Sequence, residues 1–422
     1  MAQTPSYFIA SELMIGLRWK YRMGVVFMRV LAIGGSGGMG RHAVSLIQSF
    51  DTVEEIIVAD LNEESANGFA AEMNSKVRAM GLDVNEPEAM RRAMQNVDIV
   101  LNTCGPFYRF GVPILRTAIR EGCDYIDICD DWEPTIEMLK LDQAAKTAGV
   151  TAIIGLGASP GISNMLALIA MHELDEVFSV FTGWDLGGAT PEEETSQEGL
   201  SAAMVHGIEQ MTGKVQIFRN DAVEFVKPLE PVPICYPGIS TFKGYIFGHP
   251  EAVTFPHNYP SLNQSINLAH GGDIDSILLK LILGLVNWGV VGKERAAAFL
   301  TWFEGQREVK KIEKGSETPP VMYGLATGTR ASVAASVGVA WVGEATEPES
   351  KYDVGMGAAT GVPLACGTKF LSEGRIKKCG VFSPEAGVID PKEFLEEVFV
   401  ELERLGKVPS SNLMDNIKIS YS

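Results

Sequence analysis

Cysteine is scarce and scattered in this sequence. The chain has only six cysteines, and no two of them are spaced as Cys-x-x-Cys; they stand at positions 104, 123, 129, 235, 366 and 379. Because structural zinc sites and disulfide frameworks use closely paired or regularly spaced cysteines, we expect neither, and we expect no bound metal. Unpaired thiols are typical of a reducing compartment, so we expect a cytoplasmic protein.

Positive charge is also in short supply. The sequence holds 35 lysine and arginine residues against 53 aspartate and glutamate residues, which gives a net charge of −18. A surface this acidic repels phosphate backbones and anionic lipids. We therefore expect no nucleic-acid partner and no membrane partner.

Long hydrophobic runs are missing as well. The most apolar stretch, Ile277–Val291, is too short to span a bilayer comfortably and is interrupted by Lys280 and Asn287. We expect it to form a buried helix or a helix at a subunit interface. Residues 1–27 lack the early basic region and the uninterrupted apolar core of a signal peptide, so we treat them as an N-terminal extension.

The chain contains enough hydrophobic residues to form more than one core. It has 422 residues, of which 46 % are hydrophobic and 21 % are charged. This is the composition of an ordinary globular protein and excludes a fully disordered chain. The length predicts two or more domains.

The first third of the chain alternates between short apolar runs and amphipathic stretches. The apolar runs predict strands at 29–33, 55–59, 77–82, 98–101, 125–128 and 150–154. The stretches between them predict helices that end near residue 50 or lie at 63–74, 86–95, 112–120 and 133–148. This alternation indicates βαβ units, so we expect an α/β domain with a Rossmann-type, doubly wound parallel sheet.

A glycine-rich loop follows the first predicted strand and opens the first predicted helix. It matches G-x-G-x-x-G and consists of Gly35, Ser36, Gly37, Gly38, Met39 and Gly40. In this context the pattern predicts dinucleotide binding, because a helix N-terminus offers free N–H groups to a diphosphate. We expect Gly35 to permit the tight turn, Gly37 to let the backbone approach the diphosphate, and Gly40 to let the helix pack closely.

An acidic residue follows at the distance that the Rossmann pattern requires. Asp60 ends the second predicted strand, 20 residues after Gly40, where its carboxylate can accept both ribose hydroxyls of NAD and would repel a 2′-phosphate. No arginine follows it directly, so we expect NAD, with NADP possible. Asp83 and Val84, after the third strand, are placed to touch the adenine. The alternative is a degenerate Rossmann domain that binds no nucleotide.

The loop after the fourth predicted strand is where a nicotinamide should lie. Ligands of such sheets sit beyond the carboxyl ends of the strands, near the point where the strand order reverses. The loop contains Thr103, Cys104, Gly105 and Pro106, and Tyr108 follows as a candidate substrate contact. An ordinary Gly-Pro turn is the alternative interpretation.

Four longer stretches resemble the saccharopine dehydrogenase-like oxidoreductases, which include the lysine 6-dehydrogenases. They are IGGSGGMGRHAV (33–44), VLNTCGPF with the later GVPILRTAIREGCDYIDICDD (100–131), GLGASPGISNMLA (155–167) and TGVPLACGTKFLSEGRIKKCGVFSPEAGVI (360–389). The first is common to Rossmann proteins, whereas the third and fourth, in this order and spacing, are specific. The short-chain dehydrogenases are a poor match, because the sequence has no Tyr-x-x-x-Lys pair.

The resemblance implies a layout in which a second domain interrupts the first. The dinucleotide-binding domain is then 28–160, and an α+β substrate and dimerisation domain with a mainly antiparallel sheet is 161–351. Residues 352–422 return to the Rossmann domain. The heptapeptide Glu344–Ser350 reads as a polar turn between two strands. The resemblance also implies a homodimer.

The resemblance further implies hydride transfer between a nicotinamide and the C–N bond of an amino acid or related amine. Such an enzyme must orient two carbons, manage one proton on nitrogen and anchor a substrate carboxylate. Arg109 and Arg330 are our candidates for the anchor, because a guanidinium binds a carboxylate through two hydrogen bonds. Either of them can equally be a surface charge.

A proton acceptor is needed as well. His206 lies in a stretch that aligns loosely with a family segment near substrate, and Asp131 stands with Asp130 and Glu133 beyond the fifth predicted strand. Both types of side chain can transfer protons near neutral pH when their surroundings shift the pKa. In the alternative interpretation, His206 is a packed or surface histidine and Asp131 caps the helix that begins near Glu133.

Two loops add further polar side chains. The loop Gly157–Gly161 is expected to line the crevice between cofactor and substrate, or to act as a hinge between domains. A region rich in proline, glycine and asparagine at 235–272 contains His249, His257 and His270, whose spacing matches no metal-ligand motif.

Two other functions stay open at this point. The chain can be a nicotinamide-dependent enzyme that acts on a C–O or C=C bond. It can also be a non-catalytic, nucleotide-sensing protein that keeps the Rossmann domain. Cofactor-dependent stabilisation without turnover is the property that would identify the second case.

Overall fold

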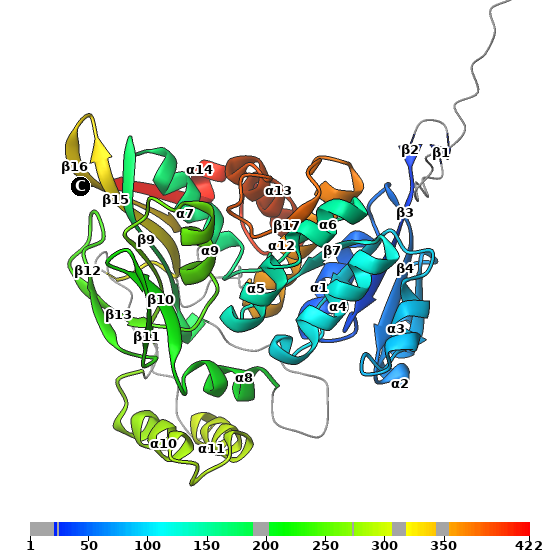
Figure 1. The fold of residues 1–422 in the computed structure, drawn as a ribbon, viewed down its shortest axis with the longest axis horizontal. Coiled ribbons are helices and arrows are strands. Elements are labelled where there is room, and N and C mark those ends of the chain that lie inside the picture. Colours follow the sequence, from blue (N-terminus) through cyan, green and yellow to red (C-terminus); the bar gives the residue numbers. More distant parts are fainter. Residues whose placement is uncertain (1–20, 23–24, 189–201, 272–273, 306–317, 343–353) are drawn as a thin grey trace, which may run out of the picture.

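The structure is a computed structural model that describes residues 21–22, 25–188, 202–271, 274–305, 318–342 and 354–422. Its first elements are two short paired strands, β1 (Tyr21–Arg22) and β2 (Val25–Val26), which precede the main body of the chain (Figure 1). The polar turn expected at 344–350 and most of the N-terminal extension lie outside the described residues.

The N-terminal part forms a seven-stranded parallel sheet in the order β17-β8-β7-β6-β3-β4-β5. Its strands are β3 (Met28–Ile33), β4 (Val53–Asp60), β5 (Val77–Gly81), β6 (Ile99–Asn102), β7 (Asp124–Asp127), β8 (Thr151–Ile153) and β17 (Gly380–Phe382). The predicted α/β class and the doubly wound parallel sheet are therefore confirmed. The middle segments Val30–Ile33 of β3, Ile56–Ala59 of β4 and Ile99–Leu101 of β6 are apolar and buried, as expected where helices cover both faces of a sheet. The strand order reverses between β3 and β6, which defines the expected ligand crevice.

The helices of this sheet follow the predicted alternation with two differences. They are α1 (Gly38–Ile47), α2 (Glu63–Ala71), α3 (Pro87–Met94), α4 (Phe107–Glu121), α5 (Trp132–Leu139) and α6 (Asp142–Ala148). Helix α4 starts well before the predicted residue 112, because Pro106 serves as its N-cap and Phe107 is buried against the core. The single helix predicted at 133–148 is two helices, because the chain closes a turn between the Leu141 N–H and the Met138 carbonyl.

The middle of the chain forms a second, mixed sheet in the order β11-β10-β14-β9-β15-β16-β18, with β12 and β13 attached beside β14. Its strands are β9 (Glu176–Asp185), β10 (Val215–Arg219), β11 (Ala222–Val226), β12 (Pro231–Ile234), β13 (Phe242–Ile246), β14 (Gln264–His270), β15 (Met322–Arg330), β16 (Val333–Trp341) and β18 (Ile417–Tyr421). Among the described strand pairs of this sheet, β9–β14 is the only parallel one, so the expected, mainly antiparallel second sheet is confirmed.

The C-terminal segment packs on both sheets. Helix α12 (Gly355–Ser372) lies against α1, and β17 pairs with β8 at one edge of the parallel sheet. After α13 (Pro391–Arg404) and α14 (Leu413–Asn416), however, β18 pairs with β16 of the second sheet. Residues 352–422 were expected to pack back on the Rossmann domain; α12 and β17 do so, and the last strand, β18, pairs within the second sheet. Helix α7 (Ile162–His172) is buried from Ile162 to Met171 where the two parts meet.

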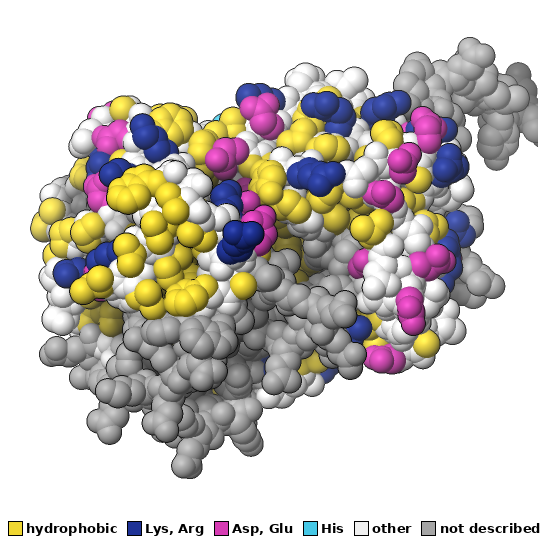
Figure 2. Space-filling view, turned by 90° about the horizontal axis from the view of Figure 1, so that it is seen from below, with side chains coloured by type: hydrophobic (Ala, Val, Ile, Leu, Met, Phe, Trp, Pro, Cys, Tyr) yellow, Lys and Arg dark blue, Asp and Glu magenta, His cyan; other side chains and the backbone are white. Residues whose placement is uncertain are grey.

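The apolar run at 277–291 lies on the outside of the second domain. It forms α10 (Ile277–Asn287), which packs beside α11 (Lys293–Gly305), below the sheet in Figure 1. Ile277 is 86 % exposed and Trp288 is 79 % exposed, and Leu281 and Val290 are exposed too. Seen from below, hydrophobic side chains gather over this part of the surface (Figure 2). Within the described residues, no helix has both the length and the apolar character needed to cross a membrane.

Candidate active site and dinucleotide-binding loop

The glycine loop joins β3 to α1 at the carboxyl end of the parallel sheet. The left-handed residue of the turn is Gly34, with φ +73°, and not Gly35 as expected from the motif. Gly35 is needed for a different reason, because a Cβ there would lie 2.9 Å from the Cβ and the carbonyl oxygen of Ala32. Thr103 Oγ1 donates to the carbonyls of Ile33 (3.1 Å) and Gly34 (2.9 Å), which fixes the loop to the end of β6.

The start of α1 is prepared for an anion. Its N-cap, Gly37, makes no side-chain hydrogen bond, and its first turn contains no acidic residue. The first N–H groups and the positive end of the helix dipole are therefore free for a phosphate. Gly40 lets the helix approach the loop, since a Cβ there would lie 2.5 Å from the Gly34 carbonyl oxygen. Gly38 has open space around it. These residues fit the diphosphate of a dinucleotide.

The expected ribose contact, Asp60, lies directly beside this loop. Its Oδ2 accepts a hydrogen bond from Ser36 Oγ (2.6 Å), and its Oδ1 accepts one from the Asn62 N–H (3.1 Å). An arginine that the motif did not reveal lies next to it: Arg41 Nε donates to the Ser36 carbonyl (2.7 Å), and its guanidinium stacks on the Phe69 ring. The ribose end of the site therefore has both a carboxylate and a cation.

Arg109, a candidate anchor for the substrate, lies on the adenine side of the crevice. Its Nη2 donates to Asn85 Oδ1 (2.7 Å), and its charge attracts Asp83. The hydrogen bonds from Asn85 lower the pKa of Asp83. Val84 packs against the core beside them. These contacts join Arg109 to the expected adenine contacts rather than to the proton-transfer candidates.

The expected nicotinamide loop follows β6. Buried Asn102 accepts from the Cys104 N–H through Oδ1 (3.0 Å) and donates to the Tyr125 hydroxyl (2.9 Å), so the strand end is rigidly held. Burial, with the nearby charge of Asp60, raises the pKa of Cys104 to about 11. The Cys104 thiol is therefore protonated at neutral pH and is no nucleophile there.

Asp131 sits at the N-terminus of α5 but does not cap it. No side-chain hydrogen bond to that helix is formed; instead Asp131 Oδ2 accepts from the Tyr108 N–H (3.3 Å) in the first turn of α4, directly after the loop expected to hold the nicotinamide. Its other oxygen lies 3.6 Å from His206 Nε2. The structure thus brings the two sequence-predicted proton-transfer residues together and does not support the capping alternative.

His206 comes from the second domain, on α8 (Ala202–Gln210). Its Nε2 lies 3.1 Å from Asp130 Oδ1, and Gln210 Nε2 donates to Asp130 Oδ2 (3.2 Å). The two side chains share one face of α8 because they are four residues apart. Asp130, Asp131 and His206 therefore form a cluster to which both domains contribute.

The protonation states of this cluster differ strongly from those in water. Burial disfavours the charge on Asp130, but the attraction of His206 outweighs it and lowers the pKa of Asp130 to about 2. Burial also disfavours charge on His206, but Asp130 outweighs it and raises the pKa of His206 to about 10. Burial and the repulsion of Asp130 raise the pKa of Asp131 to about 7. At neutral pH the first two form an ion pair, and Asp131 is poised to gain or lose a proton.

The same three side chains are the group among the described residues whose atoms could surround a metal ion, since those atoms lie within 4.8 Å of one another. The ion pair between Asp130 and His206 already balances the charge there, and a protonated imidazole cannot ligate a metal. We therefore assign no metal to this cluster.

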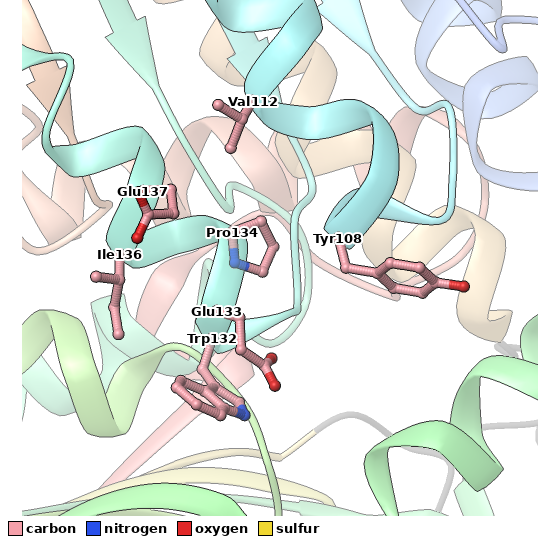
Figure 3. Close-up of a pocket in the computed structure, with 7 residues that line it drawn as sticks. All are labelled: Tyr108, Val112, Trp132, Glu133, Pro134, Ile136 and Glu137. Atoms are coloured by element: carbon pink, nitrogen blue, oxygen red, sulfur yellow. The ribbon is translucent and has the colours of Figure 1, made fainter. Parts of the chain in front are cut away.

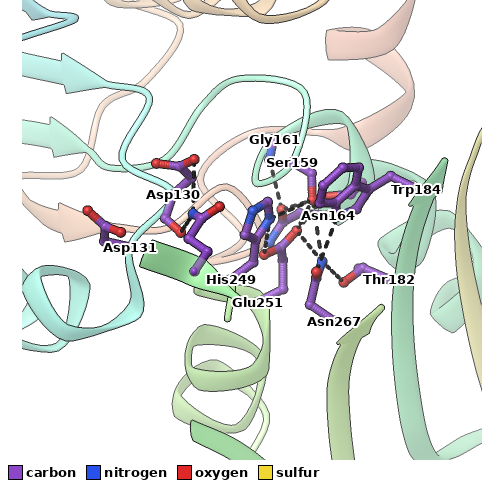
Figure 4. A network of polar contacts seen from close by, with 12 residues as sticks. Asp130, Asp131, Ser159, Gly161, Asn164, Thr182, Trp184, His249, Glu251 and Asn267 are labelled. Atoms are coloured by element: carbon purple, nitrogen blue, oxygen red, sulfur yellow. Dashed lines mark hydrogen bonds and ion pairs between the residues drawn. The ribbon is translucent and has the colours of Figure 1, made fainter. Parts of the chain in front are cut away.

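Beside the cluster lies a buried polar network that the sequence did not reveal as a unit (Figure 4). Glu251, the first residue of α9 (Glu251–Asn258), accepts at Oε1 from Ser159 Oγ (2.6 Å), Ser163 Oγ (2.8 Å) and Asn267 Nδ2 (3.1 Å). His249 Nδ1 lies 3.3 Å from Ser159 Oγ. The only sequence signals were the Gly157–Gly161 loop and a histidine in a loop-rich region; their contact depends on the packing of two domains.

Arg330 is placed far from these groups. It ends β15 at the hairpin to β16, whereas the opposite end of β15 pairs with Trp184. Its guanidinium lies 3.6 Å from Glu173 and stacks on the Tyr421 ring. The structure therefore gives Arg330 a role in joining β15, α7 and β18, and not in the cluster of Asp130, Asp131 and His206.

A cavity of about 280 Å³ opens beside the first turns of α4 and α5 (Figure 3). It is lined by Tyr108, Val112, Trp132, Glu133, Pro134, Ile136 and Glu137. Tyr108 and Val112 come from α4, and the others come from α5. Asp130, Asp131 and His206 do not line this cavity, so it is separate from the candidate proton-transfer cluster.

Comparison with known proteins gives this geometry a family context. Residues 30–153 match the family model described as the saccharopine dehydrogenase NADP binding domain. A carboxyaminopropylagmatine dehydrogenase of Synechocystis is 21 % identical over 249 residues, which are 56 % of this chain and 61 % of that protein. An L-glutamate-forming saccharopine dehydrogenase [NADP(+)] of Pyricularia oryzae is 29 % identical over 140 residues, which are 33 % of this chain and 29 % of that protein. The chain thus spans less than two thirds of either relative.

A solved structure extends the likeness to the whole fold. The apo saccharopine dehydrogenase (L-Glu forming) from Saccharomyces cerevisiae superposes with a TM-score of 0.59 at 16 % identity, covering 94 % of this chain and 100 % of that chain. The resemblance expected from the sequence is confirmed, and the N-terminal domain matches proteins that hold a nicotinamide dinucleotide.

Proposed function

We propose that the protein is an NAD(P)-dependent oxidoreductase that transfers a hydride between the nicotinamide and the C–N bond of an amine or amino acid. The observation that carries the proposal is the position of Asp131. Its side chain accepts a hydrogen bond from the Tyr108 N–H, directly after the loop expected to hold the nicotinamide, and its pKa lies at about 7. The bound cofactor would supply the hydride acceptor or donor. The protein must then supply the proton transfer on nitrogen, which a carboxyl of this pKa can perform.

The roles within the cluster follow from the protonation states. His206, with a pKa of about 10, is a cation at neutral pH and cannot accept a proton there. Asp130 holds it as an ion pair, and Asp131 is the proton acceptor for a substrate ammonium. Tyr108, 56 % exposed, stands at the entrance of the same crevice and is a candidate contact for the rest of the substrate.

The test is a spectrophotometric search for turnover. The expected result is a change of nicotinamide absorbance with at least one amine or amino acid, or with a carbonyl compound plus an amine. Turnover with alcohols or enones alone would show that the enzyme acts on a C–O or C=C bond and not on a C–N bond. Cofactor binding without any turnover would instead identify a nucleotide-sensing protein.

For the cofactor we propose NAD, because each oxygen of the Asp60 carboxylate accepts one hydrogen bond and can accept a second from a ribose hydroxyl, and the carboxylate repels a 2′-phosphate. NADP is the second candidate, favoured by the name of the matching family model and by the position of Arg41 beside Ser36.

Asp60→Ala tests this assignment. We expect the variant to bind NAD roughly 10-fold more weakly, because hydrogen bonds to a charged acceptor are lost, and to bind NADP no more weakly than the parent. Calorimetric titration with both cofactors gives the ratio, and Arg41→Ala is the matched variant that should weaken NADP only. An unchanged NAD/NADP ratio in Asp60→Ala refutes the ribose contact.

We also propose a homodimer in which the exposed face of α10 is buried.

The described cysteines are all free thiols, and we propose a cytoplasmic location on that basis.

Trp288→Glu tests the dimer. An exposed tryptophan of this size is typical of the centre of an interface, so we expect the dimer to weaken by roughly 30-fold or more. Light scattering at micromolar concentration measures the mass. Val333→Glu, at the exposed turn of the β15–β16 hairpin, is the control that should leave the mass unchanged. A monomeric parent protein would contradict the proposal.

A further inference from the structure

The buried network beside the cluster determines which nitrogen of His249 carries a hydrogen. A carboxylate only accepts hydrogen bonds, so Ser159 must use its single hydrogen to donate to Glu251 Oε1 at 2.6 Å. Asn267 Nδ2 also donates to Ser159 Oγ (3.3 Å). The remaining contact of Ser159 Oγ, to His249 Nδ1 at 3.3 Å, is then one in which the oxygen accepts. His249 Nδ1 therefore carries the hydrogen.

A neutral histidine with a protonated Nδ1 has a lone pair on Nε2. Burial lowers the pKa of His249. The positive charge of His206 lowers it further, whereas the negative charges of Glu251 and Asp130 raise it by less than burial lowers it. These are the charged groups that face His249 from α9, from the loop after β7 and from α8. The imidazole is neutral at neutral pH, and its Nε2 is an acceptor.

Nε2 is the unoccupied acceptor of this ring. Among the described residues it has no hydrogen-bond partner, and it is not one of the fully buried polar atoms that lack one, although the residue as a whole is only 5 % exposed. The ring is held in place by stacking on Trp184 (5.4 Å, 17°) and by an edge contact with Phe247 (5.3 Å, 83°). Figure 4 shows His249 between Glu251 on one side and Asp130 on the other.

We propose that His249 Nε2 is a substrate-binding acceptor that takes a hydrogen bond from the N–H of a cationic amine, and so selects an ammonium or amine over a group that can only accept. The proposal deepens the proposed function and rests on it for the reaction. Asp130 is already paired with His206, so the Asp131 carboxylate supplies the negative charge that a cation needs, whereas Glu251 and Ser159 act through His249 as positioning residues.

The tautomer can be measured without any turnover. We would record two-dimensional ¹H–¹⁵N spectra of the full chain with ¹⁵N-labelled histidine; it has six histidines, and the His249 signals are those lost in His249→Gln. At neutral pH we expect a protonated Nδ1 and an unprotonated Nε2. A protonated Nε2, in either the other tautomer or the imidazolium, would overturn the proposal.

Binding of butylammonium chloride to the NADH-saturated protein tests the contact itself. We expect the His249 Nε2 signal to move on titration, and His249→Phe, which keeps the stacking on Trp184 but has no acceptor, to bind roughly 10-fold more weakly. His249→Gln, whose amide oxygen can accept, should recover part of the affinity. His257→Phe, at an exposed position of α9, is the matched control and should bind as the parent does.

Equal affinity of His249→Phe and the parent, or no saturable binding of butylammonium, would overturn the inference. Thermal unfolding of each variant confirms that it is folded. Because neither readout uses turnover, these failures are distinct from a failure of the proposed function, which would appear as normal butylammonium binding with no nicotinamide reduction by any amine.

Discussion

Asp131→Asn is expected to lower turnover with an amine substrate by roughly 100-fold or more, the usual contribution of a positioned general base. The amide cannot accept a proton, but its oxygen can still accept the Tyr108 N–H, so the geometry at the start of α4 is kept. In the parent protein the rate should rise with pH as the Asp131 carboxyl ionises, with a midpoint near its pKa of about 7. The variant should lack this rise.

The same substitution should make the fold more stable at alkaline pH. Folding raises the pKa of Asp131 from 3.8 to about 7, so the folded state binds a proton that the unfolded state has lost. The resulting destabilisation is absent below pH 3.8, grows between these two values and is complete above the folded pKa. Asp131→Asn should therefore unfold at a higher temperature than the parent at pH 8, and the gain should shrink toward pH 4.

Glu88→Gln, at an exposed position of α3, is the matched control and should change neither the rate nor the unfolding temperature. If Asp131→Asn keeps its activity, Asp131 is not the proton acceptor that we propose; if it is less stable than the parent at pH 8, folding does not raise the pKa of Asp131.

Gly40→Ala is expected to abolish dinucleotide binding at concentrations that saturate the parent. The added Cβ would lie 2.5 Å from the Gly34 carbonyl oxygen and 2.8 Å from the Gly35 Cα. These are backbone atoms of the phosphate loop, which cannot move aside as a side chain does, so α1 must shift away from its place at the loop. Overpacking of this kind costs about 1–3 kcal/mol in stability, and it displaces the N–H groups that meet the diphosphate.

Gly38→Ala provides the comparison, because a Cβ at Gly38 meets no atom within 4 Å. Calorimetric titration with NADH should show binding close to that of the parent for Gly38→Ala and no saturation for Gly40→Ala. Equal binding by the two variants would show that the loop does not need the close approach of α1.

Most of the Rossmann domain could be predicted from the sequence, because its strands and helices each have a pattern that lies within a few neighbouring residues. A strand buried on both faces is a continuous apolar run, as at Val30–Ile33, and the helices between such runs have their own period. The start of α4 was missed because Pro106 carries no polar capping side chain. The second sheet was beyond this kind of prediction, since its pairs, such as β9 with β14 and β16 with β18, join segments far apart in the chain.

For the active-site candidates, too, the residue types could be chosen from the sequence but their contacts could not. Asp131 and His206 were chosen for their chemistry, but their contact requires α8 of one domain to reach the end of β7 in the other. Arg109 and Arg330 were chosen in the same way, and the partners that engage them, Asn85 and Glu173, could not be read from sequence. The role of His249 depends on a hydrogen-bond direction that only the arrangement around Glu251 determines.

The position of β17 has a consequence for how the protein is made. The strand Gly380–Phe382 completes one edge of the parallel sheet, yet it follows nearly all of the second domain in the chain. During synthesis the first domain leaves the ribosome with the backbone groups of β8 unpaired on that side, and an open strand edge is a site for wrong pairing. The nucleotide-binding half is thus translated first but completed only when the last part of the polypeptide has emerged.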